Sequence, residues 1–263
     1  MFVEERKQAI LDHVKAKKKA SVVELCEKFG VSSATIRNDL CDMERNRLLM
    51  RTHGGAIIQS QARFEPQAAD KYVQNAGEKR AIARLALDMV EDGDTLILDT
   101  GSTTLELARL LKAKKNITVL TNDFAIATCL EDHPDAVVYL IGGVVRKGLH
   151  CSVGNMAKRM LQGLAVDKAF MAANSFSLEK GAGTPDLNQA DLKRRMLAIA
   201  TKVIFLIDSS KFGKNSFTVF ATLDSIDCLV TDSITEEFKQ ILEDGDVEVV
   251  AANVPSIEKE EAQ

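Results

Sequence analysis

Paired cysteines, long apolar runs and nucleotide-binding signatures are all missing from this sequence. Its five cysteines are scattered without C-x-x-C spacing, which indicates neither a disulfide framework nor a zinc or other metal site. No apolar run approaches the roughly 18 residues that span a bilayer, and no signal-peptide core follows the N-terminus. Neither G-x-G-x-x-G nor a Walker pattern occurs, which argues against a dinucleotide or nucleoside triphosphate. These absences predict a cytoplasmic protein that requires no cofactor.

Charge is spread unevenly along the 263 residues, whose net charge is −4. Residues 1–60 hold 11 Lys and Arg against 8 Asp and Glu and so carry +3, whereas the remainder carries −7. A basic head on an acidic body suggests that only the head meets a polyanion.

Three helices are predicted in this head. The first covers about residues 4–15. The second follows S-V-V-E at Ser21, an S-x-x-E capping box, and ends at Gly30, a common residue after a helix. The third begins at Ser32, a natural N-cap, and is separated from the second by only a short turn. This spacing is typical of a helix-turn-helix.

The third helix is predicted to be two-faced. Ile36, Leu40 and Met43 share an apolar face at 100° per residue. The opposite face carries Ala34, Arg37, Asn38, Cys41 and Arg45, with Thr35 at its flank. Arg can pair with guanine edges and Asn with adenine edges in a major groove, and small neighbours let the backbone approach. A solvated polar face without a ligand is the alternative that periodicity leaves open.

The stretch L-L-M-R-T-H-G-G-A-I-I after the third helix predicts a hairpin, because two short apolar runs flank a turn. Such a hairpin would be a wing, whose Arg47, Arg51 and His53 would contact phosphate or the neighbouring groove. His53 alone would be unremarkable as an exposed turn residue.

Taken together, these residues resemble the DNA-binding head of the DeoR family of bacterial transcriptional regulators. The family signature V-S-x-x-T-I-R-x-D-L, followed by R-x-H-G-G-A, is matched from Val31 to Leu40 and from Arg51 to Ala56. The resemblance implies a winged helix-turn-helix that binds double-stranded operator DNA. Asn38 stands where the family often has a second Arg, which would alter base preference. The expected DNA-binding residues are Ser32, Ser33, Ala34, Thr35, Arg37, Asn38, Arg45, Arg51 and His53.

Beyond the head, apolar runs alternate with helical patterns, which predicts an α/β domain with a largely parallel sheet. The expected domains are a head at 1–58, a linker at 59–76 that is partly helical if it packs between domains, a sensor and oligomerisation domain at 77–255, and a polar tail at 256–263. The expected strands are 95–99, 117–121, 137–141, 168–172, 203–208, 228–231 and 247–251.

Polar clusters follow several of these strands, at the sheet edge where such folds bind ligands. Glycine, hydroxyls and N–H groups at a helix start suit a phosphate, Arg and Lys add charge, and Asp accepts sugar hydroxyls. Any one cluster alone is more often a capped turn. Their coincidence favours a site at Asp99, Gly101, Ser102, Thr103, Thr104, Thr121, Asn122, Gly142, Gly143, Arg146, Asp208 and Lys211.

The body also resembles the DeoR family, through D-x-G-[ST]-T, T-N, G-G-x-x-R and D-S-S-K-F-G. The resemblance implies a fold similar to ribose-5-phosphate isomerase and coenzyme A transferases, and a phosphorylated sugar as effector. The family pattern E-A-x-[LV]-K adds Lys193 to the expected site. Two departures from the family pattern are expected at the border of the pocket: Ser175 and Ser177 replace Gly and Asp, and Gln189 replaces an acid.

The main prediction is therefore a repressor of a carbohydrate-utilisation operon, controlled by a sugar phosphate and assembled as a homodimer or tetramer. An isomerase-like enzyme with an accessory DNA-binding head is a second hypothesis, although no histidine or cysteine belongs to a recognisable catalytic set. An activator with the same chemistry is a third, since nothing in the sequence sets the direction of the response.

Overall fold

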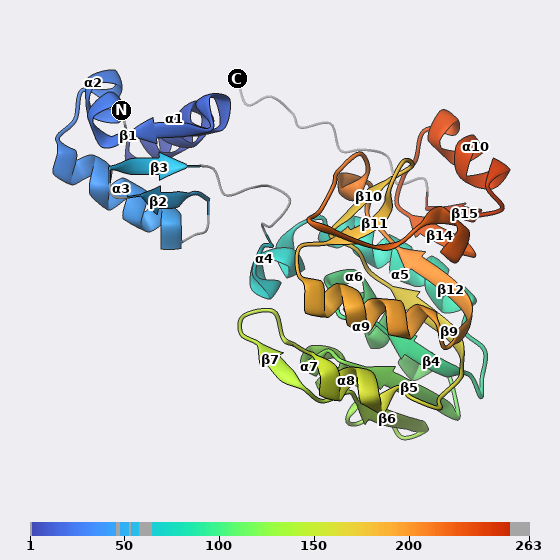
Figure 1. Cartoon of the computed structure of the whole chain (residues 1–263). Helices are drawn as coiled ribbons and strands as arrows, with labels where there is room; N and C mark the ends of the chain where they lie inside the picture. The colour runs from blue at the N-terminus through green and yellow to red at the C-terminus, as the bar shows by residue number, and fades with distance from the viewer. Residues whose placement is uncertain (1, 46–47, 53, 58–64, 253–263) are drawn as a thin grey trace. The chain divides into compact units, whose positions relative to one another are not determined.

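The computed structural model describes residues 2–45, 48–52, 54–57 and 65–252. The chain divides into two compact units, Met1–Pro66 and Gln67–Gln263 (Figure 1). The predicted polar tail and the wing residues Arg47 and His53 lie outside the described residues.

The first unit is a three-helix head with a small antiparallel sheet, which confirms the predicted winged helix-turn-helix. Its helices are α1 (Val3–Lys17), α2 (Val22–Phe29) and α3 (Ser33–Arg45). The sheet has the order β1-β3-β2, formed by β1 (Lys19–Ser21), β3 (Gly55–Ile57) and β2 (Met50–Thr52). A buried cluster that includes Ile10, Leu25 and Leu40 joins the helices.

Local caps set where the helices of the head begin and end. Ser21 Oγ accepts from Glu24 N at 3.1 Å, and Gly30 closes α2 with a φ of 65°. The reciprocal half of the predicted capping box is replaced, because the Glu24 carboxylate accepts from Lys17 Nζ at 2.6 Å and contacts His13 Nε2 at 2.9 Å. Glu24 therefore joins α2 to α1 instead of capping its own helix.

A buried ion pair fastens α3 to α1. Arg6 Nε donates to Asp39 Oδ2 at 2.7 Å, and Arg6 Nη2 donates to Asp39 Oδ1 at 3.2 Å. Both residues are buried. Asp39, the acid of the T-I-R-x-D-L motif, therefore holds α3 in place from its buried side and not from its exposed face.

The second unit contains a seven-stranded, wholly parallel sheet, and each strand coincides with one predicted from the alternation of apolar runs. Its order is β15-β14-β12-β9-β4-β5-β6. The strands are β4 (Thr95–Leu98), β5 (Ile117–Thr121), β6 (Ala136–Leu140), β9 (Val166–Met171), β12 (Ala200–Leu206), β14 (Cys228–Thr231) and β15 (Glu248–Ala251).

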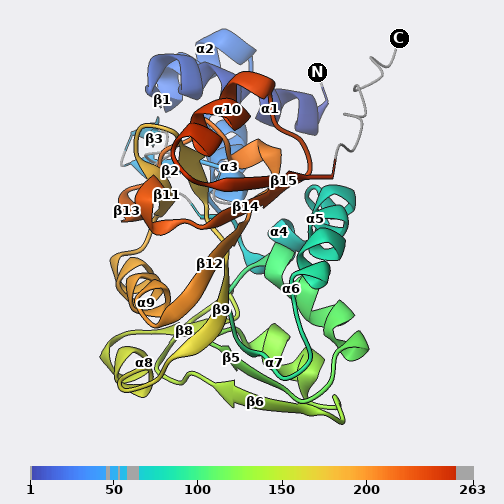
Figure 2. The ribbon, with the colours of Figure 1, turned by 90° about the vertical axis from the view of Figure 1, so that its right-hand side faces the viewer.

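Helices cover both faces of this sheet, and Figure 2 shows the sheet between the two layers. One layer packs over an apolar cluster around Leu96 and Val119 and consists of α5 (Ala76–Asp88), α6 (Ser102–Leu110) and α7 (Phe124–Leu130). The other packs over a cluster around Ala169 and Phe205 and consists of α8 (Asn155–Met160), α9 (Leu187–Leu197) and α10 (Glu236–Asp244). The predicted α/β class is thereby confirmed.

The chain winds outward from the centre of the sheet in two directions. From β4 it proceeds through β5 to β6, and it then returns to β9 on the other side of β4 and continues through β12 and β14 to β15. The switch point lies between β4 and β9. In sheets of this kind ligands bind beyond the carboxyl ends of the strands at such a point.

Several short elements lie outside the parallel sheet and were not predicted. A three-stranded antiparallel sheet consists of β10 (Ser175–Ser177), β11 (Gly181–Thr184) and β13 (Thr218–Ala221), and an antiparallel pair consists of β7 (Val144–Arg146) and β8 (Cys151–Val153). Single 3-10 turns are η2 (Leu111–Ala113), η3 (Ser209–Lys211) and η4 (Leu223–Ser225).

The second unit begins at Gln67, earlier than residue 77, because part of the expected linker is packed against it. Helix α4 (Ala68–Val73) contacts α6, and Tyr72 packs against the apolar cluster beneath that layer. Lys79 Nζ donates to the Lys71 and Gln74 carbonyls. None of the helices in the described part of the chain is long and apolar enough to cross a bilayer.

Candidate functional sites

Helix α3 has the two faces that its periodicity predicts. Ile36, Leu40 and Met43 are buried, whereas Ala34, Arg37 and Asn38 are exposed. Ser32 Oγ accepts from Thr35 N at 3.2 Å and so caps the helix, and Ser32 and Ser33 remain exposed. The exposed face therefore offers a guanidinium and an amide beside small side chains at the start of a helix, which is the chemistry that reads base edges in a major groove.

The hairpin β2–β3 follows α3 as a wing. Arg51 lies on β2, is exposed and has a guanidinium 3.9 Å from the carboxylate of Glu44. Thr35 is half-buried at the flank of the exposed face, and Arg45 is the last residue of α3. The described part of the wing therefore presents one cation next to the face of α3.

In the second unit, Asp99 and Lys193 form an ion pair at the switch point. Asp99 follows β4 and is fully buried, and Lys193 reaches its Oδ2 from α9 with only 2% of the residue exposed. Ala172 N also donates to Asp99 Oδ2 at 3.0 Å, and Lys193 Nζ donates to the Ala172 carbonyl at 2.9 Å. Asp99 Oδ1 is buried and has no hydrogen-bond partner in the described part of the chain.

The start of α6 lies against the end of β9 at the same point. A Cβ at Gly101 would lie 2.8 Å from Ala172 Cβ, so only glycine permits this approach. Thr104 is fully buried, and its hydroxyl faces the carbonyls of Asp99 at 2.7 Å and Gly101 at 2.9 Å. Thr104 therefore shapes the loop, while Ser102 and Thr103 occupy the first turn of α6.

A second buried acceptor lies beyond β5. Asn122 Nδ2 donates to the Ser152 carbonyl at 2.8 Å, whereas Asn122 Oδ1 is buried without a partner among the residues that the structure describes. Thr121 Oγ1 accepts from Asp123 N at 3.1 Å. Burial raises the pKa of Asp123, although it caps α7 and accepts from the Thr100 hydroxyl.

The loop beyond β6 brings Arg146 to α9. Arg146 Nη1 donates to Gln189 Oε1 at 2.5 Å, and Nη2 lies 3.7 Å from Asp186 Oδ2. Gly142 begins this loop, and a Cβ at Gly143 would lie 2.5 Å from the Val153 carbonyl oxygen. The substitution of Gln for an acid at 189 thus leaves the guanidinium next to a neutral amide.

Helix α9 links these clusters, because Gln189 and Lys193 are four residues apart and share one face. Gln189 contacts Arg146, and Lys193 contacts Asp99. The structure therefore brings Asp99, Gly101, Arg146 and Lys193 to one region of the sheet edge. Sequence reasoning missed Ala172, whose backbone groups bind both members of the ion pair and which no motif marks.

Asp208 and Lys211 form a separate cluster beyond β12. That strand is two positions from β4, about 10 Å along the sheet. Asn75 Nδ2 donates to Asp208 Oδ1 at 2.9 Å, and Lys211 Nζ lies 3.9 Å from Asp208 Oδ2. Burial opposes ionisation of Asp208, but Lys211 and the hydrogen bonds from Ser210 and Asn75 lower its pKa. Burial lowers the pKa of Lys211.

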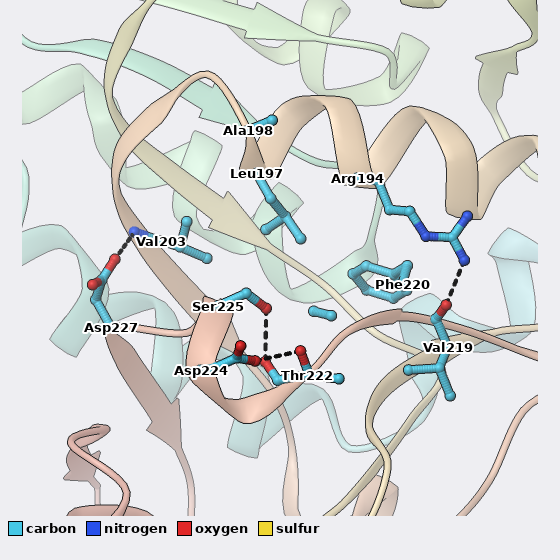
Figure 3. A pocket seen from close by; sticks show the side chains of 11 residues that line it. Arg194, Leu197, Ala198, Val203, Val219, Phe220, Thr222, Asp224, Ser225 and Asp227 are labelled. Atoms are coloured by element: carbon cyan, nitrogen blue, oxygen red, sulfur yellow. Dashed lines mark hydrogen bonds between the residues drawn. The ribbon is translucent and has the colours of Figure 1, made fainter.

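A cavity of about 620 Å³ lies elsewhere in this unit, between α9 and β13 (Figure 3). Its polar groups are bound to neighbours: Arg194 Nη2 donates to the Val219 carbonyl at 2.6 Å, and Val203 N donates to Asp227 Oδ2 at 2.6 Å. None of the predicted effector residues lines it. Within the described ranges, no group of three or more His, Cys, Asp or Glu is arranged to hold a metal ion.

A helix-turn-helix head on a parallel α/β unit with buried polar groups at its switch point defines a DNA-binding regulator. The sequence profile of the DeoR-like helix-turn-helix domain matches residues 6–62, and that of the DeoR C terminal sensor domain matches residues 74–233. The chain therefore belongs to the DeoR family of transcriptional regulators.

Relatives of similar length support this membership. The chain is 35% identical over 251 residues to the HTH-type transcriptional regulator GlpR of Haloferax volcanii, covering 95% of this chain and 98% of that protein. It is 32% identical over 233 residues to the transcriptional repressor AccR of Agrobacterium fabrum, covering 88% and 90%. Ribose 5-phosphate isomerase A of Methanocaldococcus jannaschii is 18% identical, with a TM-score of 0.39 over 53% of this chain and 55% of that one.

Proposed function

We propose that this regulator represses a carbohydrate-utilisation operon, and that a phosphorylated sugar at the carboxyl edge of the sheet controls its affinity for operator DNA. The observation that carries the proposal is the Asp99–Lys193 pair. A buried carboxylate with one oxygen lacking a partner in the described structure is costly unless a ligand supplies a donor.

The chemistry of the edge fits a sugar phosphate. Asp99 Oδ1 and Asn122 Oδ1 are two buried acceptors that sugar hydroxyls would satisfy. The phosphate would bind near the start of α6, where the helix dipole and N–H groups favour an anion. Arg146 and Lys211 supply cations on either side of this region.

A receptor explains the site better than an enzyme does. Lys193 Nζ and Ala172 N both bind Asp99 Oδ2, so this carboxylate is held in a buried structural ion pair. The relatives AccR and GlpR are named as a transcriptional repressor and a transcriptional regulator, which supports the same choice. The proposal includes a cytoplasmic location and a homodimer or tetramer, since operator half-sites usually mirror protein symmetry.

Helix α4 offers a route by which the effector site acts on the expected linker. Ala68 N donates to the Gly148 carbonyl at 2.9 Å, and Tyr72 Oη lies 3.1 Å from His150 Nδ1. Gly148 and His150 belong to the loop between β7 and β8, and β7 carries Arg146. A ligand that engages Arg146 would thus shift α4, provided that the ligand binds one arrangement of this helix better than the other.

The first experiment is a ligand screen. Thermal unfolding of the full chain is measured with sugar phosphates, with the matching free sugars and with inorganic phosphate. We expect a higher melting temperature only with phosphorylated sugars, because a ligand that binds the folded state stabilises it. Recovery of unchanged ligand supports a receptor. Turnover of the ligand, or stabilisation by free sugars alone, would contradict the proposal.

Two variants separate the sites. Arg37→Ala is expected to weaken specific operator binding by about 5- to 150-fold, which corresponds to the ~1–3 kcal/mol of a base contact, and to leave effector binding intact. Lys211→Ala is expected to do the reverse, with operator binding kept and the response to effector blunted. Arg84→Ala, at an exposed position of α5, serves as the control. Anisotropy titrations on operator DNA with and without effector measure both.

Tyr72→Phe tests the route through α4. It removes one hydrogen bond, worth about 0.5–1.5 kcal/mol, and is expected to reduce the effector's influence on operator affinity by about 2- to 12-fold. Each ligand should still bind separately. An unchanged ratio of operator affinities with and without effector would exclude this route.

A further inference from the structure

Strand β6 and its neighbours carry an unusual number of exposed apolar side chains. Tyr139 is 55% exposed and Met156 is 73% exposed. The exposed side chains, here named the β6 patch, are Val137, Tyr139, Leu140, Val144, Val145, Met156 and Met160. A soluble chain rarely leaves such a group uncovered, and patches of this kind mark interaction surfaces.

The β6 patch is continuous across three elements. Gly142, just beyond β6, donates its N–H to Met160 Sδ on α8 at 3.2 Å. A Cβ at Gly154, which precedes α8, would lie 3.8 Å from Val144 Cγ2 on β7. Figure 1 shows β6, β7 and α8 together at one end of the sheet, and Figure 2 shows β6 and α8 there.

Strand β6 is also an open edge. It pairs with β5 on one side, and no strand within the described ranges pairs with its other side. Edge strands are usually protected by charge, proline or a bulge. The sequence A-V-V-Y-L of β6 has none of these. The opposite edge strand, β15, carries Glu248, which pairs with Lys202 at 3.2 Å.

We propose that β6 is the interface between two copies of this chain, and that the two β6 strands pair antiparallel across a two-fold axis. A single patch can cover itself in this way, because a two-fold interface uses the same surface on both copies. The β6 patch offers seven large apolar residues, each at least 44% exposed, toward the ~800 Å² per partner of a stable interface.

Charge at the margin of the β6 patch favours the antiparallel arrangement. Asp132 and Asp135 are exposed ahead of β6. Arg159 is exposed on α8 beside Met160, which contacts the loop beyond the other end of the strand. An antiparallel pair brings the acidic end of one copy to the basic end of the other, whereas a parallel pair would oppose like charges.

This interface would bring two DNA-binding heads together, as the proposed function requires. Only this consequence, and not the interface itself, rests on the proposed function. Strand β7 carries Val144 and Val145 of the β6 patch and Arg146 of the effector site. An effector that engages Arg146 therefore acts next to the interface, and two copies would respond together.

The test is the oligomeric state of the full chain by sedimentation equilibrium. We expect a dimer or a multiple of one, and we expect Val137→Lys/Tyr139→Lys to weaken association at least about 100-fold, because it sets like charges opposite one another. Ile241→Lys, at an exposed apolar position of α10, should leave the mass unchanged. Circular dichroism confirms that each variant is folded.

Hydrogen exchange of the unaltered protein keeps the test decisive if the double variant fails to fold. The outward β6 amides should be protected at high concentration and lose protection on dilution. A monomer at all concentrations, free exchange of β6 within a dimer, or flotation of the protein with lipid vesicles would overturn the interface. Effector binding by a monomeric protein would refute the interface and the proposed oligomer but not the effector site, whereas a β6 dimer without sugar-phosphate binding would refute the effector site but not the interface.

Discussion

Replacement of Lys193 by Met should destabilise the second unit far more than loss of an ordinary ion pair. Asp99 would stay buried with only Ala172 N to stabilise its charge on one oxygen and no described partner on the other. Removing one member of a buried pair costs about 3–5 kcal/mol. For a domain of this size each kcal/mol lowers Tm by about 2–4 °C, so Tm should fall by about 6–20 °C.

Two further variants test this reasoning. Asp99→Asn/Lys193→Met removes both charges and should recover much of the loss, since a buried pair contributes little relative to neutral groups. Lys202→Met breaks an exposed pair with Glu248, whose side chains are 42% and 56% exposed, and should cost no more than about 1 kcal/mol.

The assay is urea unfolding followed by circular dichroism, because the chain has no tryptophan. The two units are fitted as separate transitions, and hydrogen exchange at β4 and β9 assigns the transition of the second unit. A loss below about 1 kcal/mol for Lys193→Met would show that the pair is solvated and would refute the argument for a ligand-ready buried site.

Three further changes have defined outcomes. Gly101→Ala should destabilise the second unit by about 1–3 kcal/mol in thermal unfolding because its Cβ would collide with the end of β9, whereas Gly77→Ala, where nothing lies near an added Cβ, should be neutral or stabilising. Glu24→Gln should speed hydrogen exchange of α2 at neutral pH, because it removes the charge that binds Lys17 and His13. The pKa of Glu24 in the folded chain is about 2, below its ordinary 4.5. The stabilisation by the Glu24 carboxylate is therefore present above pH 4.5 and is lost as the pH falls toward 2. Gln189→Glu should neutralise Arg146 and weaken sugar-phosphate binding several-fold in calorimetry, and tighter binding would count against a role for Arg146.

The parallel sheet was predictable because all of its strands read as apolar runs, and those between the two edge strands are largely buried. All seven predicted strands pair in one sheet, with ends displaced by a few residues. The shorter antiparallel strands have no comparable apolar run in the sequence. G-A-G-T of β11 has no β-branched or aromatic run, and it becomes a strand only because β10 and β13 supply hydrogen bonds from both sides.

The candidate site was predictable as an edge of the sheet but not as a set of contacts. Asp99 and Lys193 are 94 residues apart, and only the packing of α9 shows that they pair. Asp208 is held by Asn75, from a segment that was expected to be a linker. Sequence patterns indicate which strand ends carry polar groups, but the helix faces that complete them depend on tertiary packing.

In helix α3, the residues that stabilise the fold are different from the residues that are exposed for contact with DNA. Its inner side is secured by Ile36, Leu40 and the Arg6–Asp39 pair, whereas Arg37 and Asn38 take no part in that support. Duplicated copies of such a gene can therefore exchange their outward residues and acquire new operators without losing a folded head. The same division makes Asn38 the natural position at which to retarget this protein to a chosen DNA sequence.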